Sequence, residues 1–341
     1  MSKTTKILVS VGVALLLLGS PVLGVCAPAA PEPTRITFYS SSSGGTVWTL
    51  NEALTTFINK YSTWLKAESL ATSGGTENLR NIGEMPENRA RCIASVSENN
   101  IFTAKKGEKP WSKPYDGARI ISIQAKYRNF FVTYDPKIKT PKDLVGKKIA
   151  IPAKGIPDND VQIFPLFKYW GIMDKVDFHY LGWKKGADAL KDGMVDVTWV
   201  WTTGGPVEYY PGTYVTDLTL KKPLTFVTFP AEDILGAAKL SGHKVYPSKC
   251  PAGGFSSLRP NYPPNDIWGP SYGFSWAADE SMDPEITYEI CRIIYEHIKE
   301  FGEFHAEGKN MTREEMAWFD AEFHKGAVKF YKEKGIKIGK D

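Results

Sequence analysis

The stretch R-I-T-F-Y-S-S-S-S-G-G-T-V-W, residues 35–48, joins a strand-like segment to a helix through a turn of serine and glycine. Residues 35–39 alternate polar and apolar side chains, as a short strand does. Residues 47–61 carry apolar side chains three and four positions apart, which predicts an amphipathic helix. The order is therefore strand, small polar turn and helix, and the turn is compatible with a linker, a nucleophile site or a ligand cradle.

The same order recurs along the chain. Strands are predicted at residues 64–71, 91–96, 118–124, 129–134, 148–152, 195–201 and 272–277. Helices are predicted at residues 77–82, 140–146, 160–170, 187–193, 284–304 and 312–331. Residues 240–270 are rich in Pro, Gly and Ser and indicate a long loop region with one short strand. Alternating β and α units predict an α/β fold with parallel sheets and crossover helices.

The N-terminal segment predicts export from the cytoplasm. Lys3 and Lys6 precede residues 7–18, which are almost wholly apolar. These twelve residues are too few to cross a bilayer, which takes roughly 20. The pattern is typical of a cleaved signal peptide over residues 1–29, and the competing interpretation is a buried N-terminal helix.

Two details of this segment stay open. Cleavage after Ala27 and cleavage after Ala29 both fit the small residues there. Residues 23–26 read L-G-V-C and are similar to a lipobox, although Val25 stands where a small residue is expected. A lipid anchor at Cys26 is therefore an alternative, and a periplasmic location is expected with either.

Composition excludes several classes of protein. About 310 residues remain after the signal, enough for one large or two ordinary domains. The 42 basic and 38 acidic residues nearly balance, which argues against a nucleic-acid-binding protein. The four cysteines form no C-x-x-C pair, and the five histidines show no metal-ligand spacing, so no metal or cofactor is predicted. Cys92 and Cys291 are interpreted as core residues.

Small polar turns follow the predicted strands. They lie at residues 40–46, 72–76, 95–100, 153–160 and 202–205. In open α/β sheets, ligands bind at the carboxyl ends of the strands. Bare backbone N–H groups, helix N-termini and Ser/Thr hydroxyls there can hold an anion without an arginine. One crevice that collects several of these turns is expected to be a ligand cradle.

Catalytic motifs are missing from the same turns. No G-x-S-x-G elbow, phosphate loop or G-x-G-x-x-G fingerprint occurs, so an enzyme is not predicted. A secreted serine hydrolase that uses one of residues 40–43 stays as an alternative, but it would need a base, and no histidine sits beside another glycine turn.

Several motifs together resemble one family. They are S-S-G-G-T-V-W at 42–48, A-T-S-G-G-T-E-N-L-R at 71–80, T-P-K-D-L-V-G-K-K-I-A-I at 140–151, A-D-A-L-K-D-G-M-V-D at 187–196, C-P-A-G-G at 250–254 and H-K-G-A-V-K-F-Y-K-E-K-G at 324–335. The chain resembles the TAXI family (TRAP-associated extracytoplasmic immunogenic proteins), the solute receptors of certain tripartite ATP-independent periplasmic (TRAP) transporters. Residues 71–80 are the most specific match, with one residue fewer after the glycines than the family's T-G-G-S-x-E-N-L pattern.

The resemblance implies a type II periplasmic-binding-protein fold, in which two α/β lobes hold a ligand cleft between them. Residues 34–120 plus 251–341 would form lobe I, and residues 121–250 would form lobe II. Proteins of the family capture small organic acids or amino acids such as glutamate, deliver them to a TRAP-type membrane permease and have no catalytic activity. A periplasmic sensory receptor for a membrane kinase would have the same fold and stays as an alternative.

Ligand-binding residues carried over by position come from the turns after the strands. They are Ser42, Ser43, Gly45, Thr46, Trp48, Thr72, Ser73, Gly75, Asn78, Ser95, Ser97, Trp201, Thr202, Thr203 and Gly204. The chain departs from the family at Thr133, where many relatives carry an arginine. It also has Asp158 and Asp160 in the turn before the second-lobe helix, where they would repel a second carboxylate if they pointed inward.

Two tryptophans complete the expectation for the site. Trp199 and Trp201 share one face of a predicted strand because side chains alternate along it. They are interpreted either as core residues or as an apolar wall of the site. With the two aspartates, they favour a larger or aromatic carboxylate over glutamate.

Overall fold

The structure is a computed structural model that describes residues 33–205, 208–318 and 321–339. Its strands are β1 (Thr34–Tyr39), β2 (Leu65–Leu70), β3 (Cys92–Ser97), β4 (Ala118–Thr133), β5 (Lys148–Ile151), β6 (Asp177–Tyr180), β7 (Val197–Gly204), β8 (Tyr209–Tyr210), β9 (Thr225–Phe226), β10 (Tyr246–Cys250) and β11 (Ile267–Asp279). Its α-helices are α1 (Thr46–Tyr61), α2 (Gly75–Gly83), α3 (Glu98–Lys106), α4 (Phe164–Tyr169), α5 (Trp183–Lys191), α6 (Gly212–Lys221), α7 (Ala231–Ser241), α8 (Pro284–His297), α9 (Phe301–Phe304) and α10 (Lys325–Lys334).

The predicted signal peptide at residues 1–29 and Cys26 lie outside the described residues, so cleavage and lipid anchoring stay predictions. Within the described ranges, every helix is too short or too polar to cross a bilayer.

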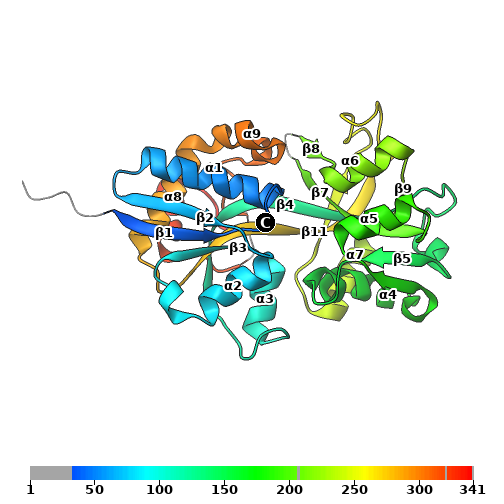
Figure 1. The fold of residues 1–341 in the computed structure, drawn as a ribbon, viewed down its shortest axis with the longest axis horizontal. Coiled ribbons are helices and arrows are strands. Elements are labelled where there is room, and N and C mark those ends of the chain that lie inside the picture. Colours follow the sequence, from blue (N-terminus) through cyan, green and yellow to red (C-terminus); the bar gives the residue numbers. More distant parts are fainter. Residues whose placement is uncertain (1–32, 206–207, 319–320, 340–341) are drawn as a thin grey trace, which may run out of the picture. The chain divides into compact units, whose positions relative to one another are not determined.

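One sheet runs through the protein in the order β2-β1-β3-β11-β4-β7-β5-β6. β1 pairs in parallel with β2 and β3, and β5 pairs in parallel with β6 and β7, as the alternating pattern predicts. β11 and β4 lie between these two groups and are antiparallel to each other. Figure 1 shows them crossing from the elements around β1–β3 to those around β5–β7.

β4 is a single strand of 16 residues, where the sequence predicts two. At about 3.3 Å per residue it is roughly 50 Å long, which is long enough to contribute side chains to two separate apolar cores. Lys126 and Arg128 interrupt the apolar pattern and hide its continuity. In the structure Lys126 forms an ion pair with Glu315, and the Arg128 guanidinium donates to the Ser248 hydroxyl.

Two register shifts in the β4–β11 pairing lie between Phe274 and Ser275 and between Trp276 and Ala277. Such bulges re-aim side chains and increase strand twist. Gln124, which lies at the first shift, donates to the Val47 carbonyl at 3.1 Å and to Asn51 Oδ1 at 3.0 Å. The β4 strand is thereby fixed to helix α1.

The apolar core divides into three clusters. The first runs from Ile36 to Tyr127 and from Tyr272 to Tyr331, and the elements around it are called lobe I here. The second and third, between Phe130 and Ile267, are called lobe II. Phe130 belongs to the third cluster and Phe131 to the second, because neighbouring side chains on β4 point to opposite faces of the sheet.

The predicted lobe boundaries stay predictions, and the packing adds one detail to them. Phe255 and Tyr262, in the loop between β10 and β11, are buried in the third cluster. The aromatic side chains of this Pro- and Gly-rich loop therefore pack with lobe II.

Two predictions near the C-terminus need correction. The helix predicted at 284–304 divides into α8, a 3-10 turn at Ile298–Glu300, and α9. The helix predicted at 312–331 is wrong, and α10 covers only its end. Ile123 N–H donates to the Met316 carbonyl at 2.9 Å and Ile120 N–H to the Glu322 carbonyl at 2.9 Å. These bonds hold the segment along β4 in place of helical bonding.

Several elements were not predicted. They are α3, β6, β8, α6, β9 and α7. Helix α3 is the one that matters for the site, because Ser97 and Asn100 form a capping box at its start. In the sequence this pair reads as the end of a polar turn, although its spacing is also that of a capping box.

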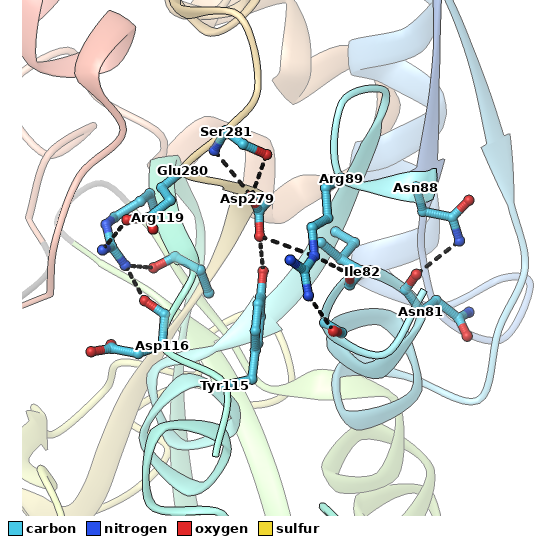
Figure 2. Close-up of polar contacts among 12 residues, drawn as sticks. Asn81, Ile82, Asn88, Arg89, Tyr115, Asp116, Arg119, Asp279, Glu280 and Ser281 are labelled. Atoms are coloured by element: carbon cyan, nitrogen blue, oxygen red, sulfur yellow. Dashed lines mark hydrogen bonds and ion pairs between the residues drawn. The ribbon is translucent and has the colours of Figure 1, made fainter. Parts of the chain in front are cut away.

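A polar cluster fixes the end of β11 (Figure 2). The Tyr115 hydroxyl donates to Asp279 Oδ2 at 2.6 Å, and the Ser281 N–H donates to Asp279 Oδ1 at 3.0 Å. Arg89 lies 3.7 Å from the same carboxylate and donates to the Gly83 carbonyl. Asp279 is buried, and these partners replace the water it has lost.

Tyr115→Phe should lower the free energy of unfolding by about 1–3 kcal/mol, because the buried Asp279 carboxylate loses a donor. Urea unfolding at pH 7 measures the change. Tyr288→Phe is the matched control, since its hydroxyl donates to the Glu333 carboxylate at 2.6 Å at an exposed position. Equal losses from the two variants would contradict the role given to the Asp279 cluster.

Candidate functional site

The first Ser/Gly turn leads from β1 into α1. Gly45 is the N-cap of α1, and Ser42 and Ser43 are exposed beside it. Thr46 is buried, with its hydroxyl 3.4 Å from His305 Nε2. Trp48 is half-buried on the first turn of the helix. The turn therefore has two exposed serines and one threonine that contacts a histidine.

The second turn is tied to its neighbours by Asn78. Its side-chain amide donates to the Ser40 carbonyl at 2.5 Å and to the Ser95 carbonyl at 2.8 Å. The Thr72 hydroxyl contacts Asn78 Oδ1 at 2.5 Å and the Ser40 carbonyl at 3.0 Å. Two predicted ligand residues, Thr72 and Asn78, thus link the ends of β1, β2 and β3.

Ser95 is also used inside the protein. It is fully buried, and its hydroxyl donates to Asn51 Oδ1 at 3.0 Å. The same oxygen accepts from the Trp276 indole N–H at 2.6 Å. Asn51 therefore connects α1 with β3 and β11, and Ser95 has its hydrogen-bonding partner within lobe I.

The predicted turn after the second-lobe strand is wrong for Thr202, Thr203 and Gly204, which lie within β7. The Thr202 hydroxyl contacts the Arg128 carbonyl at 3.4 Å, and Thr203 is fully buried. Gly204 has φ +108°, and a Cβ there would lie 2.2 Å from the Glu208 carbonyl oxygen. Only glycine fits this end of the strand.

The two tryptophans of β7 have different surroundings. Trp199 is a core residue of the second cluster, with its ring centroid 4.3 Å from that of Phe131. Trp201 is half-buried, 5.6 Å from the Tyr127 ring and 6.1 Å from the Tyr214 ring. The core interpretation is therefore confirmed for Trp199.

A cavity of about 580 Å³ lies between the two lobes. Its lining residues are Ser73, Gly74, Gly75, Thr76, Glu77, Arg80, Ser97, Asn100, Tyr272 and Phe274 of lobe I and Lys154, Gly155, Ile156, Pro157, Asp158 and Trp183 of lobe II. Three predicted ligand residues, Ser73, Gly75 and Ser97, are brought together here. The other twelve predicted residues do not line this cavity, and their ligand contacts stay predictions.

Some of the lining residues lie within the predicted polar turns but were not singled out. Asn100 closes the turn at 95–100, and Lys154 to Pro157 belong to the turn at 153–160. Tyr272 and Phe274 lie on a strand, where alternation alone does not tell which face borders a cavity. Trp183 follows Gly182 at the start of α5, whereas the helix predicted from the sequence begins only at residue 187.

The lobe I wall consists of the starts of α2 and α3. Asn100 Nδ2 donates to the Thr76 hydroxyl at 3.0 Å, and Asn100 Oδ1 accepts from the Ser97 hydroxyl at 2.8 Å. A Cβ on Gly75 would lie 2.2 Å from Asn100 Oδ1. The absence of a side chain at Gly75 therefore lets the N-terminus of α2 approach the cap of α3.

The lobe II wall contains a buried carboxylate. Asp158 exposes 6% of its surface, and Asn129 Nδ2 donates to its Oδ2 at 2.9 Å. Burial raises the pKa of Asp158 to about 6, while the neighbouring Trp199 and Asn129 side chains offset part of this effect. Asp160, two residues along, is exposed and does not line the cavity.

Aromatic rings from β4 and β11 lie beside the cavity. Tyr127 and Tyr272 stack with centroids 5.6 Å apart and an interplanar angle of 11°. Phe274 meets the Tyr127 ring edge-on at 5.9 Å. The strands that cross between the lobes thus give the cavity an apolar side formed by Tyr272 and Phe274.

The electrostatics of the cavity favour an anion at one end. The first N–H groups of a helix have no partner within the helix, and the helix N-terminus carries partial positive charge. α2 begins at Gly75, α3 follows Ser97, and α5 begins at Trp183, and all three residues line the cavity. Arg80 and Lys154 add two cationic side chains.

The Ser40–Ser43 segment shows no activated nucleophile within the described residues. Ser40 is fully buried, and the Ser41 hydroxyl donates to the Ser42 carbonyl at 3.4 Å. The histidine beside this turn, His305, contacts Thr46. A serine nucleophile needs a base within hydrogen-bonding reach, so this geometry gives the hydrolase alternative no support.

Gly75→Ala should destabilise the protein by about 1–3 kcal/mol and weaken binding in the cavity, because the new methyl group would displace Asn100 from its bridge between Ser97 and Thr76. Gly45→Ala is the control: its Cβ would meet its nearest neighbour, the Ser42 carbonyl oxygen, at 3.5 Å. Thermal unfolding of the two variants measures the difference. A Gly75→Ala protein as stable as Gly45→Ala would contradict the close approach.

Asp158 should make stability fall as the pH rises from 4 to 6. Its folded-state pKa of about 6 lies above the ordinary value of 3.8. The folded state therefore binds the proton more tightly than the unfolded state, and this contribution is lost as the pH rises through the window. A shift of about two units corresponds to at most about 3 kcal/mol.

Urea unfolding of Asp158→Asn at several pH values tests this expectation. In the variant, the free energy of unfolding should no longer show this part of the fall between pH 4 and pH 6. The difference in stability between the variant and the wild type should therefore shift in favour of the variant from pH 4 to pH 7. Asp160→Asn, at the exposed neighbouring aspartate, should keep the wild-type profile. An unchanged profile in Asp158→Asn would contradict the assignment.

Comparison with known proteins identifies the family. A profile of the NMT1-like family matches residues 38–335, and no curated protein matches the chain. The periplasmic aliphatic sulphonate binding protein SsuA from Escherichia coli has a TM-score of 0.50 at 12% identity, over 90% of this chain and 76% of its own. This likeness bears on the fold alone.

Two further solved structures are similar at lower TM-scores. The TctC solute binding protein from Polaromonas has a TM-score of 0.48 at 12% identity, over 79% of this chain and 84% of its own. The alkanesulfonate-binding protein SsuA from Xanthomonas axonopodis pv. citri has 0.42 at 12%, over 80% of each chain. With its two lobes and the cavity between them, the chain has a type II periplasmic-binding-protein fold and belongs to the NMT1-like family.

Proposed function

We propose that this protein is an extracytoplasmic solute receptor that captures a small organic anion between its lobes and delivers it to a TRAP-type membrane permease. The observation that carries the proposal is the cavity between the lobes, which collects the starts of α2, α3 and α5. A volume of about 580 Å³ suits a small ligand. Binding there would not require catalysis, so the protein is proposed to have no enzymatic activity.

The ligand class is proposed from the lining. The helix N-termini would receive a carboxylate, and Arg80 and Lys154 add positive charge at the edge of the cavity. Tyr272, Phe274 and Trp183 would contact an apolar or aromatic body of the ligand. An amino-acid-like or aromatic acid fits both features.

The transporter class rests on sequence motifs. Residues 71–80 resemble the TAXI pattern, and within them Ser73, Gly75 and Thr76 line the cavity. The relatives of known structure include periplasmic binding proteins, which supports a periplasmic location. TAXI membership and TRAP delivery are proposed together, because a TAXI receptor serves a TRAP permease.

Native mass spectrometry of the mature protein, followed by thermal-shift screening of organic acids, tests the proposal. A ligand present at 100 times its Kd stabilises the folded state by about 2.7 kcal/mol, so one acid class should raise Tm by several degrees. Trp183→Ala should weaken that ligand about tenfold through lost ring contact. Leu220→Ala, at a residue 81% exposed, should leave binding unchanged.

Other results would contradict parts of the proposal. The absence of a bound mass and of any shift across amino acids, oxo acids and aromatic acids would overturn the anion receptor. Stoichiometric labelling of Ser40–Ser43 by a serine-reactive probe would favour the hydrolase. Uptake of the identified acid by cells that carry a TRAP-type permease, with and without the receptor, tests delivery.

A further inference from the structure

The charged side chains around the cavity between the lobes differ between its exposed and its buried parts. The proposal of an anionic ligand does not account for this difference. The cavity's cationic side chains lie at exposed positions: Arg80 has a side chain 43% exposed, and Lys154 is exposed. Its buried carboxylate, Asp158, exposes 6% of its surface. A ligand in this cavity therefore meets Arg80, Lys154 and the exposed Glu77 near the solvent and the Asp158 carboxylate in the interior.

The exposed cations are already engaged with other groups. Arg80 forms an ion pair with Glu84 at 2.7 Å, and the Lys154 ammonium lies 5.1 Å from the Tyr180 ring centroid. Asp158 differs from them, because within the described ranges no lysine or arginine forms an ion pair with it. Its neighbours are neutral: Asn129, which also donates to Gln162 Oε1 at 3.1 Å, and Trp199.

A buried carboxylate without a cation disfavours a second carboxylate beside it. Two carboxylates that share a site cannot both stay ionised without a large cost. A ligand ammonium has the opposite effect, since it supplies both charge and hydrogen-bond donors to a desolvated anion. The faces of aromatic rings such as Tyr272 also attract cations. Tyr272 lines the same cavity as Asp158 and interacts electrostatically with it.

We propose that Asp158 determines specificity in this cavity: it selects a zwitterion whose amine meets Asp158 and whose carboxylate meets the start of α2, and it rejects dicarboxylates. The inference rests on the proposed receptor function and narrows its ligand class. The carboxylate end is assigned to the Gly75–Thr76 turn, because the N–H groups there precede the first helical bond, which Asn78 N–H donates to the Gly74 carbonyl at 3.0 Å. The Glu77 carboxylate of the same turn folds back onto Ser73, from whose N–H it accepts at 2.8 Å.

An amine fits Asp158 better than a metal ion does. Among residues 33–205, 208–318 and 321–339, no three His, Cys, Asp or Glu side chains come together in a metal-binding group. Asp158 would be a lone carboxylate ligand with amide neighbours, whereas hard divalent cations take several oxygen ligands. A single ammonium needs no more than the carboxylate and the adjacent ring.

The test compares linear ω-amino acids of two to six carbons with dicarboxylates of the same length, by thermal shift and titration calorimetry at pH 7.5. At least one amino acid should bind wild type about tenfold or more tightly than its dicarboxylate partner, because the two differ only in the group that faces Asp158. Asp158→Asn should lose about tenfold or more for that amino acid and should reverse or abolish the preference. Asp160→Asn, at the exposed neighbour, should behave as wild type.

Each outcome either supports or overturns the inference. Tighter binding of the dicarboxylates, with no binding of the amino acids, overturns the inference and leaves the receptor function standing. Unchanged selectivity in Asp158→Asn, with a melting curve that shows a folded protein, also overturns it. Asp158→Ala serves as a second variant if the asparagine protein fails to fold. Failure of all probes on wild type overturns the zwitterion, and the wider acid screen then decides the receptor function separately.

Discussion

The antiparallel pairing of β4 with β11 is the constraint on which the rest of the structure depends. Both strands belong to the cores of both lobes, so the two lobes share one continuous sheet. Asn51 and Gln124 fix that sheet to α1 from the lobe I side. The cavity lies where the parallel strands of each lobe end, and the crossing strands supply its aromatic side. A change in their register would move every lining residue of one lobe relative to the other.

Sequence patterns predicted the parts of the fold in which one face of an element is buried and the other is wet. β1, α1, β2, α2 and β3 follow their patterns closely. The strands shared by the lobes did not, because burial on both faces removes the alternation and Lys126 and Arg128 imitate a break. The helix predicted at 312–331 failed for a different reason: its apolar residues are spaced for a helix, but the backbone of Met316 and Glu322 bonds to β4. Long-range pairing of this kind leaves no local signal.

The sequence predicted where the site lies better than it predicted which residues line it. The polar turns do gather at the strand ends, and Ser73, Gly75 and Ser97 border the cavity. Small polar side chains in adjacent turns also bond to one another, and sequence alone does not separate the two uses. Asn78 and Ser95 hold strand ends together, whereas Asp158, noted in the sequence only as a departure, lines the cavity. Which hydroxyl or amide is left for a ligand is decided by the packing around it.

The three buried cysteines give the two lobes separate chemical reporters. Cys92 and Cys291 belong to the first core cluster and Cys250 to the third, and none of them is in a disulfide. Burial raises the pKa of Cys250 and of Cys291 to about 12, so on the order of one thiol in ten thousand is ionised near pH 8. Alkylation of either thiol must then wait for its own lobe to open. The order in which an alkylating reagent marks these residues would show whether the lobes unfold together or one after the other, without any engineered probe.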